Sequence, residues 1–283
     1  MSGDRDGRLL GMVLAIAVSI TAPTTNVSAE EARVSLGIDG THRTGEWTPV
    51  KVRLPSPGAG RVRVAVEDPD GQFVASPPIT PDSDGATFTT CIRPGRPLAR
   101  LRILSDGRGD GAVESIEPPP GHTVPSSTPL LLVVGDVPAA QSATRLVAGE
   151  EVAMEVIHPE TPSDIVASDP RDFDCFDAAI VCGTTIAQLS PSTLEALDGW
   201  VKRGGRLILS AGASAIALAA SDGPARSWLP CTNLRLVPLR RAGAIEAFAR
   251  ASGLTARVPA AGLTVPRCES PQGMTGVVDV FEG

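Results

Sequence analysis

The chain has 283 residues, enough for two domains of ordinary size, and 42% hydrophobic with 20% charged residues is typical of a globular protein. Aromatic residues make up only 3%, with no Tyr, so aromatic stacking platforms for sugars or bases are not expected. The net charge of −7 without a Lys/Arg cluster argues against nucleic acid and anionic membrane surfaces as partners.

The N-terminal segment has the pattern of an export signal. Arg5 and Arg8 precede an apolar run over residues 9–20, and small residues before Glu30 fit a signal-peptidase site with cleavage after Ala29. The run is shorter than the ~20 residues that span a bilayer, which disfavours an uncleaved membrane anchor. We therefore expect residues 1–29 to be a signal peptide and the mature protein to be periplasmic, envelope-associated or secreted.

Short β-like runs separated by turn signals fill residues 30–118. The segment "RVRVAV" alternates strictly, as a half-buried strand should, and the stretch shows no helical period. The turns "DPDG" and "DSDG" could open a calcium loop, but they lack its further carboxylates, so hairpin turns are favoured. We predict an antiparallel, immunoglobulin-like β-sandwich with strands at 32–38, 47–54, 61–68, 86–92 and 98–104.

A proline-rich stretch then predicts a domain boundary near residue 125. The segment "EPPPGHTVPSSTP" has three consecutive prolines, which favour an extended, semi-rigid spacer without regular structure. We assign residues 119–128 to this linker.

Residues 129–283 alternate strands and helices, which predicts a doubly wound, flavodoxin-like parallel sheet. The best-signalled helix has Ser190 as N-cap, Pro191 in the first position and Gly204 as its stop. Further helices are expected at 139–149 and 242–253. The expected strands are 130–136, 152–157, 176–183, 206–210, a fifth at 232–239, and a final one at 277–283.

The five cysteines form no CxxC pair and have no metal-type spacing with the three histidines, so we expect no metal site. Export permits disulfides, but an odd count leaves at least one free thiol. We expect zero or one disulfide bridge among Cys91, Cys175, Cys182, Cys231 and Cys268.

The segment "FDAAIVCGTTIAQLSPSTLEALDGWVKRGGRLILSAGAS" resembles the class I glutamine amidotransferase-like domains of large exported or membrane-anchored bacterial proteins of the planctomycete type. The resemblance covers about residues 129–253, and "GEWTPVKVRL" is similar to the start of the β-sandwich that precedes such domains. Members of this group usually continue further, often to a transmembrane helix. The chain is therefore expected to be truncated at its C-terminus, or to be a fragment.

The resemblance implies a Cys at the bend after a strand, followed by a His and an acidic partner. Here the bend is Ser210-Ala211-Gly212-Ala213-Ser214, without Cys, and the histidines His42, His122 and His158 all precede it. A thiolate or alkoxide needs an imidazole to take its proton, so the family's catalytic triad cannot be assigned to this chain. We expect no catalytic residues and no cofactor.

Three alternatives remain. Ser214 half-matches the G-x-S-x-G elbow with His158 as its base, but Ile216 replaces the last glycine, and a helix-capping role for Ser214 is favoured. Cys182 ends a strand, yet a buried structural thiol is favoured over a nucleophile. His158 is favoured as a surface or strand-end residue.

The expected function is binding or assembly at the cell envelope without catalysis, and the alternative is a hydrolase or amidotransferase-like enzyme using Ser214 or Cys182. Partners are unknown, and envelope proteins or a small polar ligand fit the composition. In a doubly wound sheet a ligand binds where the strand order reverses, beyond the carboxyl ends of the first and third strands. The candidate ligand-binding residues are therefore Asp136, Cys182, Gly183, Thr184, Thr185, Ser210 and Ser214.

Overall fold

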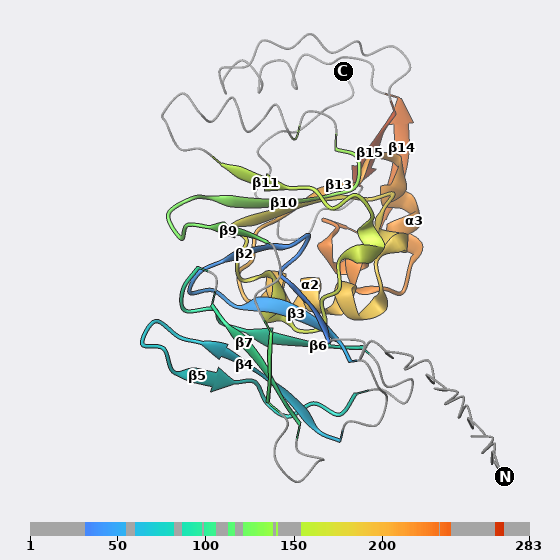
Figure 1. The fold of residues 1–283 in the computed structure, drawn as a ribbon. Helices are drawn as coiled ribbons and strands as arrows, with labels where there is room; N and C mark the ends of the chain where they lie inside the picture. The colour runs from blue at the N-terminus through green and yellow to red at the C-terminus, as the bar shows by residue number, and fades with distance from the viewer. Residues whose placement is uncertain are drawn as a thin grey trace, which may run out of the picture. The chain divides into compact units, whose positions relative to one another are not determined.

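The computed structural model is a mixed structure of several small sheets and few helices, and its described residues belong to one compact unit, Glu31–Gly283 (Figure 1). It describes residues 32–54, 60–81, 87–97, 99–105, 113–116, 121–137, 140, 154–231, 233–238 and 264–268. Several expected segments lie outside the described residues: the signal peptide 1–29, the "DSDG" turn 82–85, the helix 242–253 and the strand 277–283. Of the expected helix 139–149, only Ala140 is described.

Two antiparallel sheets form the N-terminal part. One has the order β1-β3-β6, with β1 Arg33–Leu36, β3 Thr48–Arg53 and β6 Thr87–Ile92. The other has the order β5-β4-β7-β8, with β5 Phe73–Ala75, β4 Val62–Glu67, β7 Leu101–Ser105 and β8 Val113–Ile116. Five of these strands match the runs expected from the sequence, whereas β5 and β8 were not anticipated.

The two sheets share one hydrophobic core. Alternate residues of β4 enter it, since Val62, Val64 and Val66 belong to this core. On the other face Arg63 is half-buried but Ala65 and Glu67 are buried, so β4 is covered more fully than its alternating sequence predicts. Strands β1, β3, β6 and β7 contribute to the same core through Leu36, Val50, Val52, Phe88, Ile92, Leu101 and Ile103. The "DPDG" segment is the hairpin turn between β4 and β5, where Asp68 Oδ1 accepts the N–H groups of Asp70 and Gln72.

Part of the expected linker is a strand. β9 (His122–Val124) pairs in parallel with β2 (Thr41–Arg43), a strand that sequence reasoning missed. Val124 is fully buried and packs, together with Ile38, into the core of the C-terminal part. The proline-rich stretch is therefore regular over these residues, because the backbone of β2 supplies hydrogen-bond partners that the linker sequence cannot supply itself. The division into domains at 30–118 and 129–283 stays a prediction.

A four-stranded parallel sheet forms the centre of the C-terminal part. Its order is β11-β10-β12-β13, with β11 Glu155–Ile157, β10 Leu130–Val134, β12 Ala178–Cys182 and β13 Leu207–Ser210. All five residues of β10 are buried, as its uninterrupted apolar sequence predicts for a central strand.

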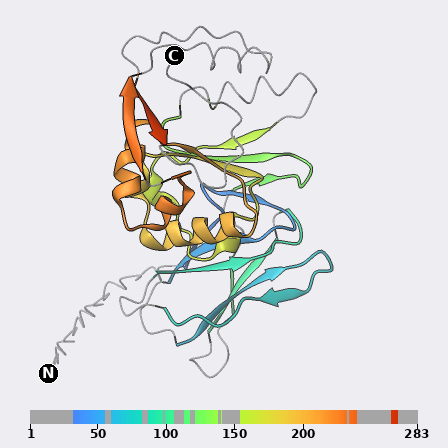
Figure 2. The ribbon, with the colours of Figure 1, turned by 180° about the vertical axis from the view of Figure 1, so that it is seen from behind.

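Helix α2 (Pro191–Lys202) covers one face of this sheet (Figures 1 and 2). Ser190 caps it by accepting the Thr193 N–H, and Gly204 follows its end at φ +102°, as predicted. Leu197 and Trp200 are buried against the sheet, with Leu194 and Val201 packed beside them. Short helical turns complete this part: η2 Pro162–Asp164, η3 Pro170–Phe173, η4 Ile186–Gln188, η5 Gly212–Ser214, α3 Ala215–Ala220 and η6 Pro224–Trp228.

The prediction of a fifth parallel strand at residues 232–239 is wrong. β14 (Leu234–Pro238) pairs antiparallel with β15 (Thr264–Cys268) in a separate two-stranded sheet. Leu236 is 43% exposed, so the run lacks the two-sided burial of a central parallel strand. A disulfide joins Cys231 to Cys268 beside this pair, within the expected range of zero or one bridge, and Cys91, Cys175 and Cys182 are free.

Candidate functional site

The residues expected to bind a ligand lie at the carboxyl ends of β10, β12 and β13. Asp136 follows β10 and is exposed, Cys182 is the last residue of β12, and Ser210 is the last residue of β13. The Gly183 N–H donates to the Ser210 carbonyl at 3.0 Å, which joins the ends of β12 and β13. The sheet thus brings these residues to one edge, while Thr184 points its exposed hydroxyl toward Cys182.

Thr185 fills the space between the ends of β10 and β12. Its buried hydroxyl donates to the Cys182 carbonyl at 2.7 Å. A Cβ placed on Gly135, which has φ +85°, would lie only 2.3 Å from the Thr185 methyl carbon. Thr185 therefore packs directly on the backbone of Gly135, at the point where the ends of β10 and β12 meet.

The bend after β13 is packed in the same way. A Cβ on Gly183 would lie 2.1 Å from Ser214 Oγ and 3.0 Å from the Ala211 Cα. Ser214 precedes α3 but makes no side-chain cap bond, contrary to expectation, and its hydroxyl donates instead to the Ala211 carbonyl. The reason is its helical backbone (φ −68°, ψ −14°), since a capping residue has an extended backbone.

Cys182 is half-buried rather than buried, because it is the last residue of β12 and lies at the carboxyl end of the strand. Its Sγ lies 3.1 Å from Thr184 Oγ1. His158 follows β11 and is exposed, as expected, and its Nε2 lies 3.0 Å from the Gly135 carbonyl oxygen. Activation of Cys182 or Ser214 would require an imidazole at hydrogen-bond distance, and the His158 ring is directed to the backbone instead.

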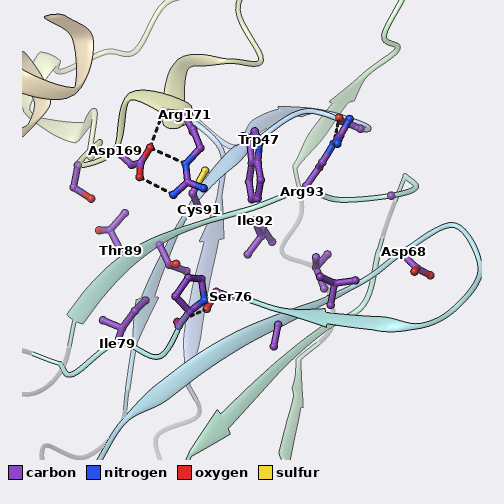
Figure 3. A pocket seen from close by; sticks show the side chains of 18 of the residues that line it. Trp47, Asp68, Ser76, Ile79, Thr89, Cys91, Ile92, Arg93, Asp169 and Arg171 are labelled. Carbon is purple, nitrogen blue, oxygen red and sulfur yellow. Dashed lines mark hydrogen bonds and ion pairs between the residues drawn. The ribbon is translucent and has the colours of Figure 1, made fainter. Parts of the chain in front are cut away.

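A cavity of about 610 Å³ lies elsewhere, between β5, β6 and the segment around η3 (Figure 3). Its lining is mainly apolar and includes Trp47, Val66, Val74, Ile79 and Ile92. Thr89, Thr90, Ser76 and Arg93 add polar groups. The volume is in the range of small-molecule and peptide-binding clefts.

Arg171 is fixed at one side of this cavity. It donates to both carboxylate oxygens of Asp169, from Nε at 2.9 Å and from Nη2 at 2.8 Å, and its guanidinium stacks 4.8 Å from the centre of the Trp47 ring (Figure 3). The hydrogen bonds from Arg171 lower the pKa of Asp169, and those to Asp169 raise the pKa of Arg171. Both side chains are therefore charged and held in a fixed geometry, and their opposite charges cancel.

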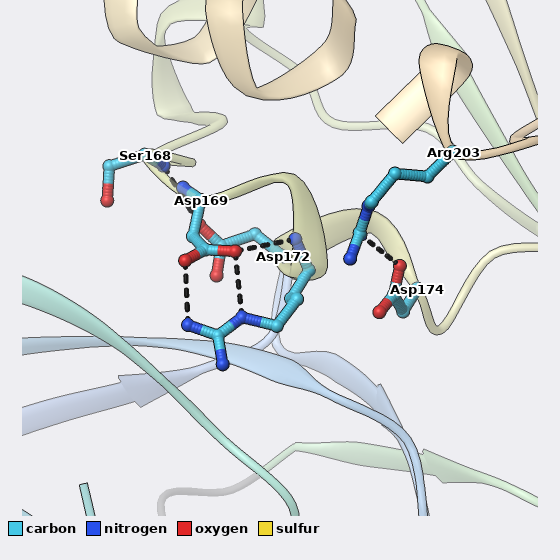
Figure 4. A network of polar contacts seen from close by, with 6 residues as sticks. Ser168, Asp169, Asp172, Asp174 and Arg203 are labelled. Atoms are coloured by element: carbon cyan, nitrogen blue, oxygen red, sulfur yellow. Dashed lines mark hydrogen bonds and ion pairs between the residues drawn. The ribbon is translucent and has the colours of Figure 1, made fainter. Parts of the chain in front are cut away.

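Behind this pair, η3 is held by a buried carboxylate (Figure 4). Asp172 accepts the N–H groups of Ser168 at 2.8 Å and Asp169 at 2.9 Å, while Asp169 accepts the Arg171 N–H. Burial raises the pKa of Asp172 despite these bonds, and burial beside Asp172 raises the pKa of the Cys91 thiol. Burial thus favours the protonated form of the Cys91 thiol, which is the less nucleophilic form.

Arg43 links the N-terminal part to the parallel sheet. This buried side chain donates to the Thr128 carbonyl at 2.6 Å and to Asp177 Oδ2 at 2.7 Å. Asp177 also accepts the Leu130 N–H at 2.7 Å, so the contact sits where β10 and β12 begin. Burial opposes ionisation of Asp177, but the bonds from Arg43 and Leu130 outweigh it and lower the pKa.

The sequence did carry a signal for η3 that we did not use: "SDPRD" has an Asp before Pro and a second Asp three residues later, the pattern of a capped helical start. Nothing in the sequence places this turn beside Trp47. In the described part of the chain, no group of three or more His, Cys, Asp or Glu side chains could hold a metal ion. No helix among the described elements is long and apolar enough to cross a membrane.

Comparison with known families gives no matching family model, and comparison with curated proteins gives no match.

Proposed function

We propose that the protein is an exported, non-catalytic binding protein of the cell envelope. It would consist of an immunoglobulin-like β-sandwich followed by a flavodoxin-like, amidotransferase-like α/β domain. The shared core of the two antiparallel sheets supports the sandwich. The strand order β11-β10-β12-β13 is the second-first-third-fourth order of flavodoxin-like sheets and supports the α/β assignment. Export rests on the sequence of residues 1–29.

One observation carries the absence of catalysis. Gly183 packs so closely on Ser214 that a Cβ there would lie 2.1 Å from Ser214 Oγ, and this contact holds the hydroxyl inside the bend. The Ser214 hydroxyl, which the enzyme alternative would use, donates to a backbone carbonyl. The cavity beside Trp47 lies against β5 and β6, away from this bend.

Reactivity of the two candidate nucleophiles tests this function. A fluorophosphonate probe should leave Ser214 unmodified, and iodoacetamide should alkylate Cys182 no faster than it alkylates free N-acetylcysteine at the same pH. The matched controls are Ser214→Ala and Cys182→Ala, with Ser192→Ala as a serine control on the exposed start of α2. Labelling of Ser214, or alkylation of Cys182 more than tenfold faster than the free thiol, would refute the non-catalytic function.

Export is tested separately. Expression of the full chain in a bacterial host, followed by mass spectrometry of the exported fraction, should give a mature N-terminus at Glu30. A chain that keeps residues 1–29 and remains in the cytoplasm would contradict the localisation.

A further inference from the structure

The cavity beside Trp47 is bounded by two strand edges rather than by two sheet faces. β6 is the outer strand of the β1-β3-β6 sheet, and β5 is the outer strand of the β5-β4-β7-β8 sheet. The lining includes consecutive residues of both strands, Thr89–Ile92 of β6 and Val74–Ala75 of β5, and continues into residues 93 and 76–77 just after them. Because successive side chains of a strand point to opposite faces, a cavity that touches consecutive residues lies along the edge of the strand.

The edge of β6 offers backbone hydrogen-bonding groups. Within the described residues β6 pairs with β3 alone, over the whole register from Thr87 to Ile92. In an antiparallel strand with one neighbour, alternate residues direct their N–H and C=O groups away from that neighbour. Such an edge is a template for a further strand.

The floor of the cavity is apolar and incompletely covered. Val66 and Val74 are direct cross-strand partners on β4 and β5, and Ile92 of β6 faces the same core. Val66 and Ile92 are buried, but the Val74 side chain is 57% exposed, which is unusual for a large apolar residue beside a core. A side chain that covers Val74 would remove apolar surface from water.

One cation remains at the rim of the cavity. Arg171 is paired with Asp169, whereas Arg93 makes no ion pair within the described part of the chain. The Nε of Arg93 donates to the Gly45 carbonyl, which holds the guanidinium in place, and among the described residues its two terminal nitrogens have no ion-pair partner. These nitrogens fit a carboxylate.

We propose that this cavity binds a short extended peptide segment of a partner protein, which adds as a strand to the β6 edge. The segment would carry apolar side chains at alternate positions, facing Val66, Val74 and Ile92, and a carboxylate against Arg93. Four residues of β6, from Thr89 to Ile92, and the following Arg93 border the cavity and, at about 3.4 Å per residue, span ~17 Å, so about five peptide residues fit. The proposal names the ligand class of the proposed binding function and rests on it.

Binding of synthetic peptides to the purified full chain tests this assignment by fluorescence polarisation. The probes are fluorescein-labelled hexapeptides in which Val, Ile, Leu or Phe alternates with Thr, each made with a C-terminal Glu or Lys. Each probe has a counterpart with the same side chains and N-methylated alternate amides, in both registers. Dodecanoate serves as a small amphipathic anion without a peptide backbone.

We expect the acidic probes to bind, the N-methylated counterparts to bind at least tenfold more weakly, and hydrogen exchange to slow at amides of residues 87–93. Val74→Arg should weaken binding about tenfold by placing a charge on the apolar floor. The matched control is Leu236→Arg, at an exposed apolar residue of β14 outside the cavity lining, and it should leave affinity unchanged. Arg93→Glu should reverse the preference between the Glu and Lys probes.

Unchanged thermal midpoints of the variants show that they are folded. The proposal is overturned if no probe binds more tightly than its N-methylated counterpart, or if Val74→Arg and Leu236→Arg have the same effect. It is also overturned if dodecanoate alone binds in a Val74-dependent manner, because the cavity would then be a site for amphipathic small molecules. These outcomes leave the probe-reactivity test untouched, so failure of the peptide site and failure of the non-catalytic function are distinguishable.

Discussion

Replacing Arg43 with Met removes the clearest polar link between the N-terminal sheets and the parallel sheet. Met keeps most of the apolar stem and deletes the guanidinium that bonds the Thr128 carbonyl and Asp177. The Arg43 side chain is 7% exposed and that of Asp177 is 50% exposed. The bond to the carbonyl is therefore buried on the Arg side, whereas the ion pair is largely screened by solvent.

The magnitude follows from these exposures. A hydrogen bond from a charged donor contributes about 1.5–3 kcal/mol when buried, and we take ~1.5 for the carbonyl. A half-exposed ion pair contributes about 0.5 kcal/mol. The free energy of unfolding should thus fall by about 2 kcal/mol, which for an m-value of about 2 kcal/mol/M lowers the urea midpoint by ~1 M.

Urea unfolding followed by circular dichroism measures this midpoint, and a double-mutant cycle with Asp177→Asn isolates the pair. The cycle should return a coupling energy of about 0.5 kcal/mol, because the carbonyl bond survives in Asp177→Asn. Lys51→Met, an exposed substitution of similar size on β3, serves as the control and should change the midpoint little. An Arg43→Met midpoint equal to that of the wild type would refute the reasoning.

Three further predictions follow from single packing or charge features. Glu67→Gln should lose stability at pH 6, because bonds from Arg100 and Arg96 lower the pKa of Glu67 to about 2 from its ordinary 4.5. This stabilisation is complete above pH 4.5 and disappears toward pH 2, so the thermal midpoints of variant and wild type should converge at low pH. A difference in midpoint that stays constant with pH would contradict the prediction. Gly183→Ala should cost about 1–3 kcal/mol in urea unfolding, since its Cβ meets Ser214 Oγ, and adding Ser214→Ala should recover part of the loss; no recovery would place the strain at Ala211 instead. Phe173→Ala should cost about 3–5 kcal/mol, because this fully buried ring packs beside Trp200, whereas a loss under 1 kcal/mol would show that the core can collapse around it.

Local patterns predicted the parts of the fold that each segment determines by itself. Helix α2 was recognised from its N-cap Ser190, its Pro191 and its terminal Gly204, all of which act through the adjacent backbone. β10 was recognised because five consecutive apolar residues fit a strand buried on both faces. β2 and β9 were missed because neither has an apolar pattern of its own, and each exists through pairing with a distant partner.

The same limit applies to the candidate sites. Strand order placed Asp136, Cys182 and Ser210 at one edge correctly, since the ends of parallel strands share an edge. The close packing of Thr185 on Gly135 and of Ser214 on Gly183 could not be predicted, because the spacing of these residues in the sequence does not indicate the contact. The cavity beside Trp47 combines residues 45–95 with 168–171, and no periodicity links segments so far apart.

The two parts of the chain complete the peptide-binding cavity together. Its strand edges come from β5 and β6, but the Asp169–Arg171 pair that stacks on Trp47 comes from the segment between β11 and β12. That segment is held on its other side by the α/β core, through buried Phe173 and through Pro170, which packs so closely on α2 that a Cβ at Gly199 would lie 2.5 Å from it. On the proposed function, the C-terminal part serves as a rigid support that positions one wall of the binding site. A wall that Phe173 and Pro170 already hold in place lowers the ordering cost of binding an extended segment.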